Sequence, residues 1–244
     1  MKSRFIWRAL KARYRDQRAE LAAMRDVLRP GDTAVDIGSN KGSYLLWLSR
    51  WVGPGRVVAF EPQPVLAGYL RRACGELSLK NVIVEPKGVS AKSGEQTLYV
   101  PGGSTSPEAS LNKKVAGRDA CGSIAVPVVS LDDYFASDSR VRVIKIDVEG
   151  HEQAVFQGAV RLLAEQSPVL VFECEARHLD QGSVTDVFGF LAGLGYGGRF
   201  VDGRRLRPIS EFRVEKHQRQ AEGKFWNAKD YRNNFVFSRA PAGA

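Results

Sequence analysis

The sequence of 244 residues is poor in cysteine and histidine, with three of each. Cys74, Cys121 and Cys174 are odd in number and lack CxxC spacing, which argues against a disulfide framework and against a zinc site. No apolar run approaches the roughly 18 residues of a membrane-spanning helix, and charges interrupt the apolar positions of the basic N-terminus, unlike a signal peptide. These absences predict a cytoplasmic protein with no transmembrane segment.

Hydrophobic residues make up 43% and charged residues 26% of the chain, values typical of a globular protein. The length suits one sizeable domain. We expect a basic helical extension over residues 1–30 and a single domain over residues 31–244. Apolar residues at helical spacing predict that one leading helix packs on this domain, with Phe5, Trp7 and Tyr14 on its packing face. The spaced residues are Leu10, Tyr14, Leu21, Met24 and Leu28.

The net charge of +9 is concentrated at the two ends. Residues 1–29 hold nine Lys/Arg against three Asp/Glu, and residues 201–244 hold ten against five. Such ends suit nucleic acid, an anionic membrane or an acidic substrate, although a solvated basic surface is the simpler interpretation. Because no RNA-binding motif is recognisable, we expect no specific nucleic-acid partner.

Apolar segments of strand length alternate with helical segments through most of the chain, which predicts a mainly parallel α/β sheet. The exception is residues 92–127, which predict two short strands around a polar loop, a kind of segment that is often functional. The expected strands cover residues 33–38, 55–62, 81–90, 141–148 and 169–175, and closing strands are expected within 198–210 and 233–239.

A glycine-containing turn, Asp36-Ile37-Gly38-Ser39-Asn40-Lys41-Gly42, joins the first strand to its helix. Glycine lets the backbone approach a ligand closely, and the helix that follows presents free N–H groups. Glu61 ends the second strand, where an acid can accept hydrogen bonds from ribose hydroxyls. The turn departs from the dinucleotide and P-loop patterns, and its opening acid suits an amino-bearing ligand such as S-adenosylmethionine.

The segment Lys145-Ile146-Asp147-Val148-Glu149-Gly150-His151-Glu152 ends a central strand, where open α/β sheets place ligands. Along an extended chain, Asp147, Glu149 and His151 share a side. Glu173 and Glu175 end the next strand and can line the same cleft. His178 and His217 lack comparable neighbours and are interpreted as structural or surface residues.

These motifs resemble the FkbM-like methyltransferases, a family of class I S-adenosylmethionine enzymes. The resemblance covers about residues 33–175, through VDIGSNKGSY, VVAFEPQP, VIKIDVEGHEQAVFQGA and LVFECE. It implies a Rossmann-like, mostly parallel sheet of seven strands with a terminal antiparallel hairpin, helices on both faces, and O-methylation of a sugar or other natural-product hydroxyl. It also implies that the cofactor loop contains Asp36, Gly38, Asn40 and Gly42, and that Glu61 holds the ribose.

Methyl transfer to a hydroxyl needs a base or a metal, and the sequence leaves both open. We expect His151 to act as the base, oriented by Asp147 or Glu149. Alternatively, Asp147, Glu149 and Glu173 hold a divalent metal that lowers the pKa of the hydroxyl. Two other functions stay open: an RNA methyltransferase, and a non-catalytic Rossmann-like module that binds nucleic acid or an anionic membrane.

Overall fold

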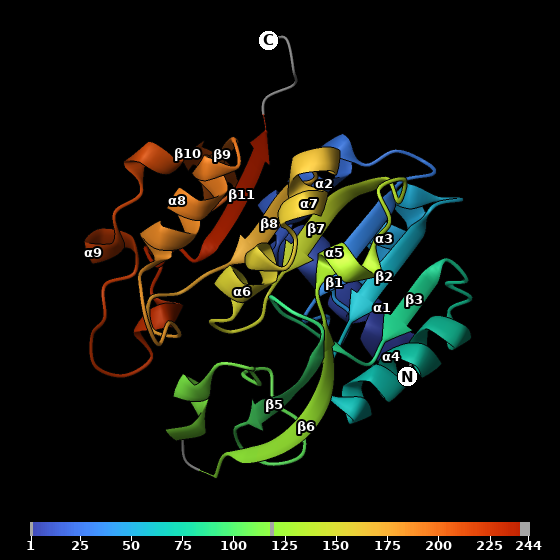
Figure 1. Ribbon diagram of the computed structural model, residues 1–244, viewed down its shortest axis with the longest axis horizontal. Coiled ribbons are helices and arrows are strands. Elements are labelled where there is room, and N and C mark those ends of the chain that lie inside the picture. The colour runs from blue at the N-terminus through green and yellow to red at the C-terminus, as the bar shows by residue number, and fades with distance from the viewer. Residues whose placement is uncertain (1, 118–119, 240–244) are drawn as a thin grey trace.

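The computed structural model describes residues 2–117 and 120–239, and its centre is an eight-stranded sheet (Figure 1). Five strands run parallel in the order β3-β2-β1-β7-β8. β11 lies antiparallel between β8 and β9, and β10 completes a hairpin with β9. The Rossmann-like sheet with a terminal antiparallel hairpin is therefore confirmed, with one strand, β10, more than the expected seven. The strands are β1 Thr33–Ile37, β2 Arg56–Phe60, β3 Val82–Glu85, β7 Val141–Ile146, β8 Val169–Glu173, β9 Tyr196–Asp202, β10 Arg205–Pro208 and β11 Asn234–Arg239.

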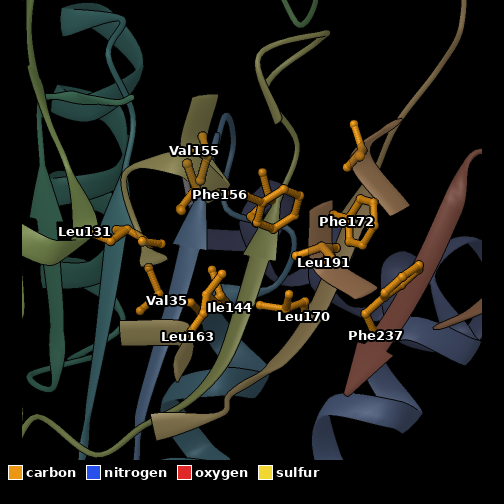
Figure 2. Packing of buried hydrophobic residues seen from close by; sticks show 14 of the residues in the cluster. Val35, Leu131, Ile144, Val155, Phe156, Leu163, Leu170, Phe172, Leu191 and Phe237 are labelled. Carbon is orange, nitrogen blue, oxygen red and sulfur yellow. The ribbon is translucent and has the colours of Figure 1, made fainter. Parts of the chain in front are cut away.

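Helices cover both faces of this sheet because alternate strand residues point to opposite sides. Val143 packs with the helices of one face, whereas Ile144 and Ile146 pack with those of the other. Figure 2 shows the second core, in which Phe156 and Leu163 lie against Ile144, Leu170 and Phe172. The first face carries α1 Lys2–Lys11, α2 Arg18–Val27, α3 Leu45–Val52 and α4 Pro64–Glu76; the second carries α5 Leu131–Tyr134, α6 Glu152–Gln157, α7 Val160–Gln166 and α8 Val184–Gly193.

The leading helix is broken in two by a π-helical turn, Ala12–Asp16, between α1 and α2. Both halves pack on the domain, as expected: α2 lies on the sheet through residues such as Leu21, and α1 lies on α3 and α4 through Phe5. The predicted packing face was wrong for Trp7 and Tyr14, whose side chains are 62% and 65% exposed. The π turn contains an extra residue, so one helical periodicity does not describe both halves.

A second sheet of three strands, in the order β4-β6-β5, protrudes below the main sheet (Figure 1). Its strands are β4 Gly88–Val89, β5 Gly94–Val100 and β6 Gly122–Val129. The single strand expected over residues 81–90 is divided between the two sheets, because Pro86 cannot donate a hydrogen bond to a continuous strand ladder. The expected polar loop joins β5 to β6, and its residues Arg118 and Asp119 lie outside the described residues.

Short helical segments lie in the loops. η2 Lys113–Gly117 belongs to the β5–β6 loop, and η3 Ile209–Glu211, α9 Val214–His217 and η4 Phe225–Asn227 lie between β10 and β11. His217 is buried, and its Nδ1 accepts a hydrogen bond from the Arg213 backbone N–H at 2.9 Å. Its predicted structural role therefore has a physical basis. None of the helices in the described ranges is long and apolar enough to cross a bilayer.

Candidate active site

A first cavity opens at the carboxyl ends of β1, β2 and β7, where the strand order reverses and open α/β sheets bind ligands. The loop after β1 contributes Gly38 and Asn40 to its wall, and the residue after β2 contributes Glu61. Pro107 and Ser110 from the β5–β6 loop line the opposite side. The loop singled out for its length therefore forms part of the cavity wall.

Gly38 is required by both its conformation and its surroundings. Its φ of 71° lies in the left-handed region, and a Cβ atom there would meet the Asp147 carbonyl oxygen at 1.9 Å. Asn40 also has a positive φ, 46°, a conformation that asparagine tolerates better than most residues. This tight turn holds the loop directly against the end of β7.

Glu61 is 2% exposed and lines the cavity. Its carboxylate accepts the backbone N–H groups of Asn40 at 2.7 Å and Gln63 at 2.9 Å. A carboxylate has about four acceptor sites, so further sites remain for a pair of ligand hydroxyls. Burial raises the pKa of Glu61 to about 7, and a ligand that donates hydrogen bonds would favour its ionised form.

Two residues predicted to contact the cofactor do not line this cavity. Asp36 is fully buried behind the loop. Gly42 has a φ of 76°, and a Cβ there would meet the rings and methyl groups of Phe5 and Leu70 at 2.7 and 2.9 Å. Gly42 thus lets α1 and α4 pack against the loop, and the expected direct contact of both residues with the cofactor needs correction.

Lys145 lies in the candidate site, although in the sequence it stands out only as one member of an acidic segment. Its ammonium group lies 3.4 Å from Asp36 Oδ1 and 3.5 Å from Asp147 Oδ2, and it donates to the Gly38 carbonyl at 3.2 Å. Burial opposes its charge, but the two carboxylates outweigh this effect and raise the pKa of Lys145. The sequence indicates this role through one feature: a lysine lies between Ile144 and Ile146 in an apolar strand, where a charged residue is rare.

A second cavity lies on the other side of the Gly38 loop. Asp147 and Asn40 line both cavities, so the two meet at this point. The second cavity also receives Asp16 and Glu20 from the leading helices and Glu173 from β8. Four carboxylates therefore face it together with one ammonium group, that of Lys145.

Glu20 was not identified from the sequence, where it is one charge in an amphipathic helix. Its side chain is 3% exposed, and burial raises its pKa to about 7. Within the described ranges, its carboxylate accepts a hydrogen bond only from its own backbone N–H group. A buried acid that lines a cavity without a donor from another residue is suited to a ligand hydroxyl or ammonium group.

Asp147, Glu149 and Glu173 are brought together at the strand ends, as the metal alternative requires. One carboxylate oxygen from each lies within 4.8 Å of the others. Burial, reinforced by the charge of Asp147, raises the pKa of Glu173 well above its ordinary value. Oxygen donors of this kind fit a divalent cation such as Mg²⁺, which would relieve their mutual repulsion.

His151 is separated from this cluster, contrary to the expectation. β7 ends at Ile146, and Glu149 and Gly150 then adopt φ values of 55° and 93°, so the alternation assumed for an extended chain does not continue. His151 Nε2 instead lies 2.9 Å from Ser90 Oγ and lines neither cavity. Burial lowers its pKa to about 4, which makes it a weak base at neutral pH.

His178 is the histidine that contacts the cluster. Its Nδ1 lies 2.8 Å from Glu149 Oε2, and its side chain is buried. The backbone of the same turn is held by Ser110, whose hydroxyl donates to the Val148 and Glu149 carbonyls at 3.0 and 2.9 Å. The unusual backbone at Glu149 is therefore fixed by its surroundings, a common property of functional turns.

A doubly wound sheet with these cavities at its reversal point belongs to the Rossmann-like class of cofactor-binding proteins. Comparison with protein-family models matches residues 36–197 to the Methyltransferase FkbM domain. The chain therefore belongs to the FkbM family of S-adenosylmethionine-dependent methyltransferases. This result confirms the family and the methyl donor expected from the sequence.

One curated protein is similar to this chain in sequence, and two solved structures are similar to it in fold. The hexuronic acid methyltransferase AglP of Haloferax volcanii is 29% identical over 171 residues, which cover 68% of this chain and 65% of AglP. A crystal structure of methyltransferase FkbM from Methylobacillus flagellatus KT has a TM-score of 0.54 at 17% identity, covering 96% of this chain and 57% of that one. A putative rRNA methylase from Clostridium thermocellum has a TM-score of 0.52 at 14% identity, with 91% and 95% covered. The two structures support the fold alone.

Proposed function

We propose that this protein transfers the methyl group of S-adenosylmethionine to a hydroxyl of a saccharide or a similar small natural product. The observation that carries the proposal is the meeting of the two cavities at Asp147. One cavity has the buried acid expected for a ribose, and the other has polar walls suited to an acceptor. A methyl group and a hydroxyl held in these cavities would meet beside the Asp147 carboxylate.

Holding the reactants is the main task of the protein, because methyl transfer from sulfur is an in-line displacement. We assign binding of the cofactor to Gly38, Asn40 and Glu61. The reaction forms an oxygen–carbon bond, breaks the sulfur–carbon bond and releases the hydroxyl proton. We assign acceptance of that proton to Asp147, whose carboxylate lies 3.5 Å from the Lys145 ammonium group.

A metal-assisted version is the second candidate, favoured by the spacing of Asp147, Glu149 and Glu173. These three residues would hold the cation, which would lower the pKa of the acceptor hydroxyl. The neighbouring Lys145 supplies a competing positive charge at 3.5 Å from Asp147. Turnover that is lost with a chelator and restored by Mg²⁺ would favour the metal; turnover unaffected by the chelator would favour Asp147 alone.

The acceptor class follows from the charge of the second cavity. AglP is named for a hexuronic acid, which supports a saccharide acceptor. In this chain, however, Asp16, Glu20, Asp147 and Glu173 line the cavity, and Lys145 is the one cationic side chain among its described lining residues. Asp16 is also paired with Lys11 and Arg15, which do not line the cavity. Because like charges repel, we propose a neutral or amine-bearing saccharide in preference to a uronate.

The test is transfer of a radioactive methyl group from S-adenosylmethionine to a panel of methyl glycosides, aminosugars and uronic acids. We expect a product with a neutral or amine-bearing acceptor that is stable to base, as an ether is and an ester is not. Preference for uronic acids would contradict the proposed acceptor class. Methylation of RNA without any saccharide product would instead favour the RNA methyltransferase.

A further inference from the structure

An exposed apolar stripe follows the outer face of α1. Eight large hydrophobic residues are strongly exposed in the described chain, and four of them lie between residues 6 and 14. Ile6 is 37%, Trp7 62%, Leu10 41% and Tyr14 65% exposed. Since successive helical residues are about 100° apart, Ile6, Leu10 and Trp7 fall within roughly a third of the helix circumference. We call these four residues the outer stripe.

Cations flank the outer stripe. Residues 2–18 contain seven Lys/Arg and one acid, Asp16, which gives a net charge of +6. On the helix circumference, Lys2 lies on one side of the stripe, and Arg4 and Lys11 lie on the other. Asp16 is paired with Lys11 at 2.9 Å. A helix whose apolar stripe has cations on both sides has the pattern of an interfacial membrane helix.

The opposite face of α1 is fixed to the protein, so the outer stripe cannot turn inward. Phe5 is fully buried against the Gly42 loop. Trp47 donates its indole N–H to the Ala9 carbonyl at 2.8 Å. The helix therefore keeps its outer stripe exposed while its inner face is packed on the core.

Aromatic and basic side chains extend this surface onto α3. Tyr14 meets Trp47 edge to face at 6.1 Å, and Trp47 stacks on Trp51 at 6.2 Å. The guanidinium groups of Arg13 and Arg50 lie over the rings of Trp51 and Trp47. Such mixtures of indole rings and cations are typical of proteins at the lipid headgroup level.

We propose that α1 and its outer stripe dock this protein on an anionic membrane surface. Lipid headgroups complement the +6 charge, and the acyl region takes the aliphatic side chains of Ile6 and Leu10. RNA would satisfy the cations but offers no apolar phase for those two residues. A second copy would bring two segments of the same charge together, which opposes self-association through this face.

Docking would also orient the acceptor cavity. Asp16 ends the π-helical turn that follows α1, Gln17 comes next, and both line the second cavity. The membrane would then lie next to the side of the protein at which we propose that the acceptor enters. We therefore interpret residues 1–30 as an extension with two roles: its inner face completes the core and its outer face binds lipid. Docking requires no methyl transfer, so it can be tested separately.

Sedimentation with vesicles tests this proposal. The full chain should bind vesicles of 70% phosphatidylcholine and 30% phosphatidylglycerol and should bind pure phosphatidylcholine at least about tenfold more weakly. Trp7→Ala with Leu10→Ala should weaken binding about tenfold, whereas Val65→Ala with Ile124→Ala, also exposed apolar positions, should have little effect. The intrinsic tryptophan fluorescence should shift to shorter wavelength on binding, and the shift should be smaller in Trp7→Ala, in which Trp47, Trp51 and Trp226 remain.

Charge variants give the second half of the test. Arg4→Glu with Arg15→Glu should abolish vesicle binding, whereas Arg204→Glu with Arg205→Glu removes equal charge from the other basic end and should preserve most of it. Methylation of a water-soluble acceptor should continue in every stripe variant, so a failed docking test and a failed activity test remain distinct. Equal binding of wild type and stripe variants, binding to RNA alone, or dimerisation that depends on Trp7 would overturn the proposal.

Discussion

The two cavities that meet at Asp147 differ in how the chain builds them. The first cavity, to which we assign the cofactor, takes Gly38, Asn40 and Glu61 from two consecutive strand–helix connections. The second cavity, to which we assign the acceptor, brings together Glu20 and Glu173 from segments about 150 residues apart in the sequence. The first is built from residues that are close in the sequence, whereas the second depends on how the particular helices pack. Variants should therefore separate binding of the donor from turnover of the acceptor.

Asp147→Asn should have the largest effect. Removal of the carboxylate at the junction eliminates both the proposed base and a metal ligand, and turnover should fall about a hundredfold or more. Cofactor affinity, measured by calorimetry, should stay within about threefold, because the backbone of Asp147, and not its carboxylate, packs against Gly38. Asp138→Asn, at an exposed position, is the control. Normal turnover of Asp147→Asn would remove Asp147 from the mechanism.

Glu61→Gln should affect the first cavity and weaken binding of the cofactor. Loss of charged hydrogen bonds to ribose should weaken cofactor binding by about 1–3 kcal/mol, with a much smaller change in turnover at saturation. Glu76→Gln, exposed at the end of α4, is the matched control. If the dissociation constant of the cofactor stays unchanged, the role of Glu61 is to hold the loop through Asn40 and Gln63.

The same residue predicts a pH dependence. Burial raises the pKa of Glu61 from its ordinary 4.5 to about 7, so the empty protein holds this proton at pH 6. Ribose hydroxyls favour the ionised carboxylate, so binding must release the proton and affinity should rise about tenfold between pH 6 and pH 8. Calorimetry in buffers of different ionisation enthalpy measures the released proton. Glu61→Gln should lose this dependence; its persistence would assign the proton to another group, such as Glu20.

Gly42→Ala tests whether a motif glycine serves the helices instead of the cofactor. The new methyl group would meet Phe5 and Leu70 and would require a strained φ, so the free energy of unfolding should fall by about 1–3 kcal/mol. Cofactor affinity should change less than in Glu61→Gln. Gly75→Ala, where a Cβ meets nothing within 4 Å, is the control for thermal denaturation.

His151→Ala should have the smallest effect on catalysis. The ring contacts Ser90 and lines neither cavity, so turnover should stay within about threefold. Stability should fall by roughly 1 kcal/mol through the lost hydrogen bond. Ser90→Ala should show a similar loss, because it removes the same contact. A hundredfold drop in turnover would restore His151 as the base.

The sequence predicts most of this fold because each central strand is an apolar run of distinct length, as in residues 141–146. It predicts that Gly38, Asn40 and Glu61 lie together because they follow the ends of neighbouring strands, but not that Asp36 and Gly42 lie away from the cavity. It fails where alternation stops: Glu149 turns the chain with a positive φ, and His151 leaves the cluster while His178 enters. Glu20 has no local signature, since only tertiary packing brings it to the cavity.

The π-helical turn at Ala12–Asp16 holds one residue more than a regular α-helical turn. Because its hydrogen bonds close over five residues instead of four, the extra residue is accommodated within the turn and α1 keeps its place on the core. Removal of one residue from this turn should therefore leave Phe5 against Gly42 and Trp7 exposed. One residue inserted within α1 itself, after Ala9, would instead rotate the residues before it by about 100° and move Phe5 away from Gly42.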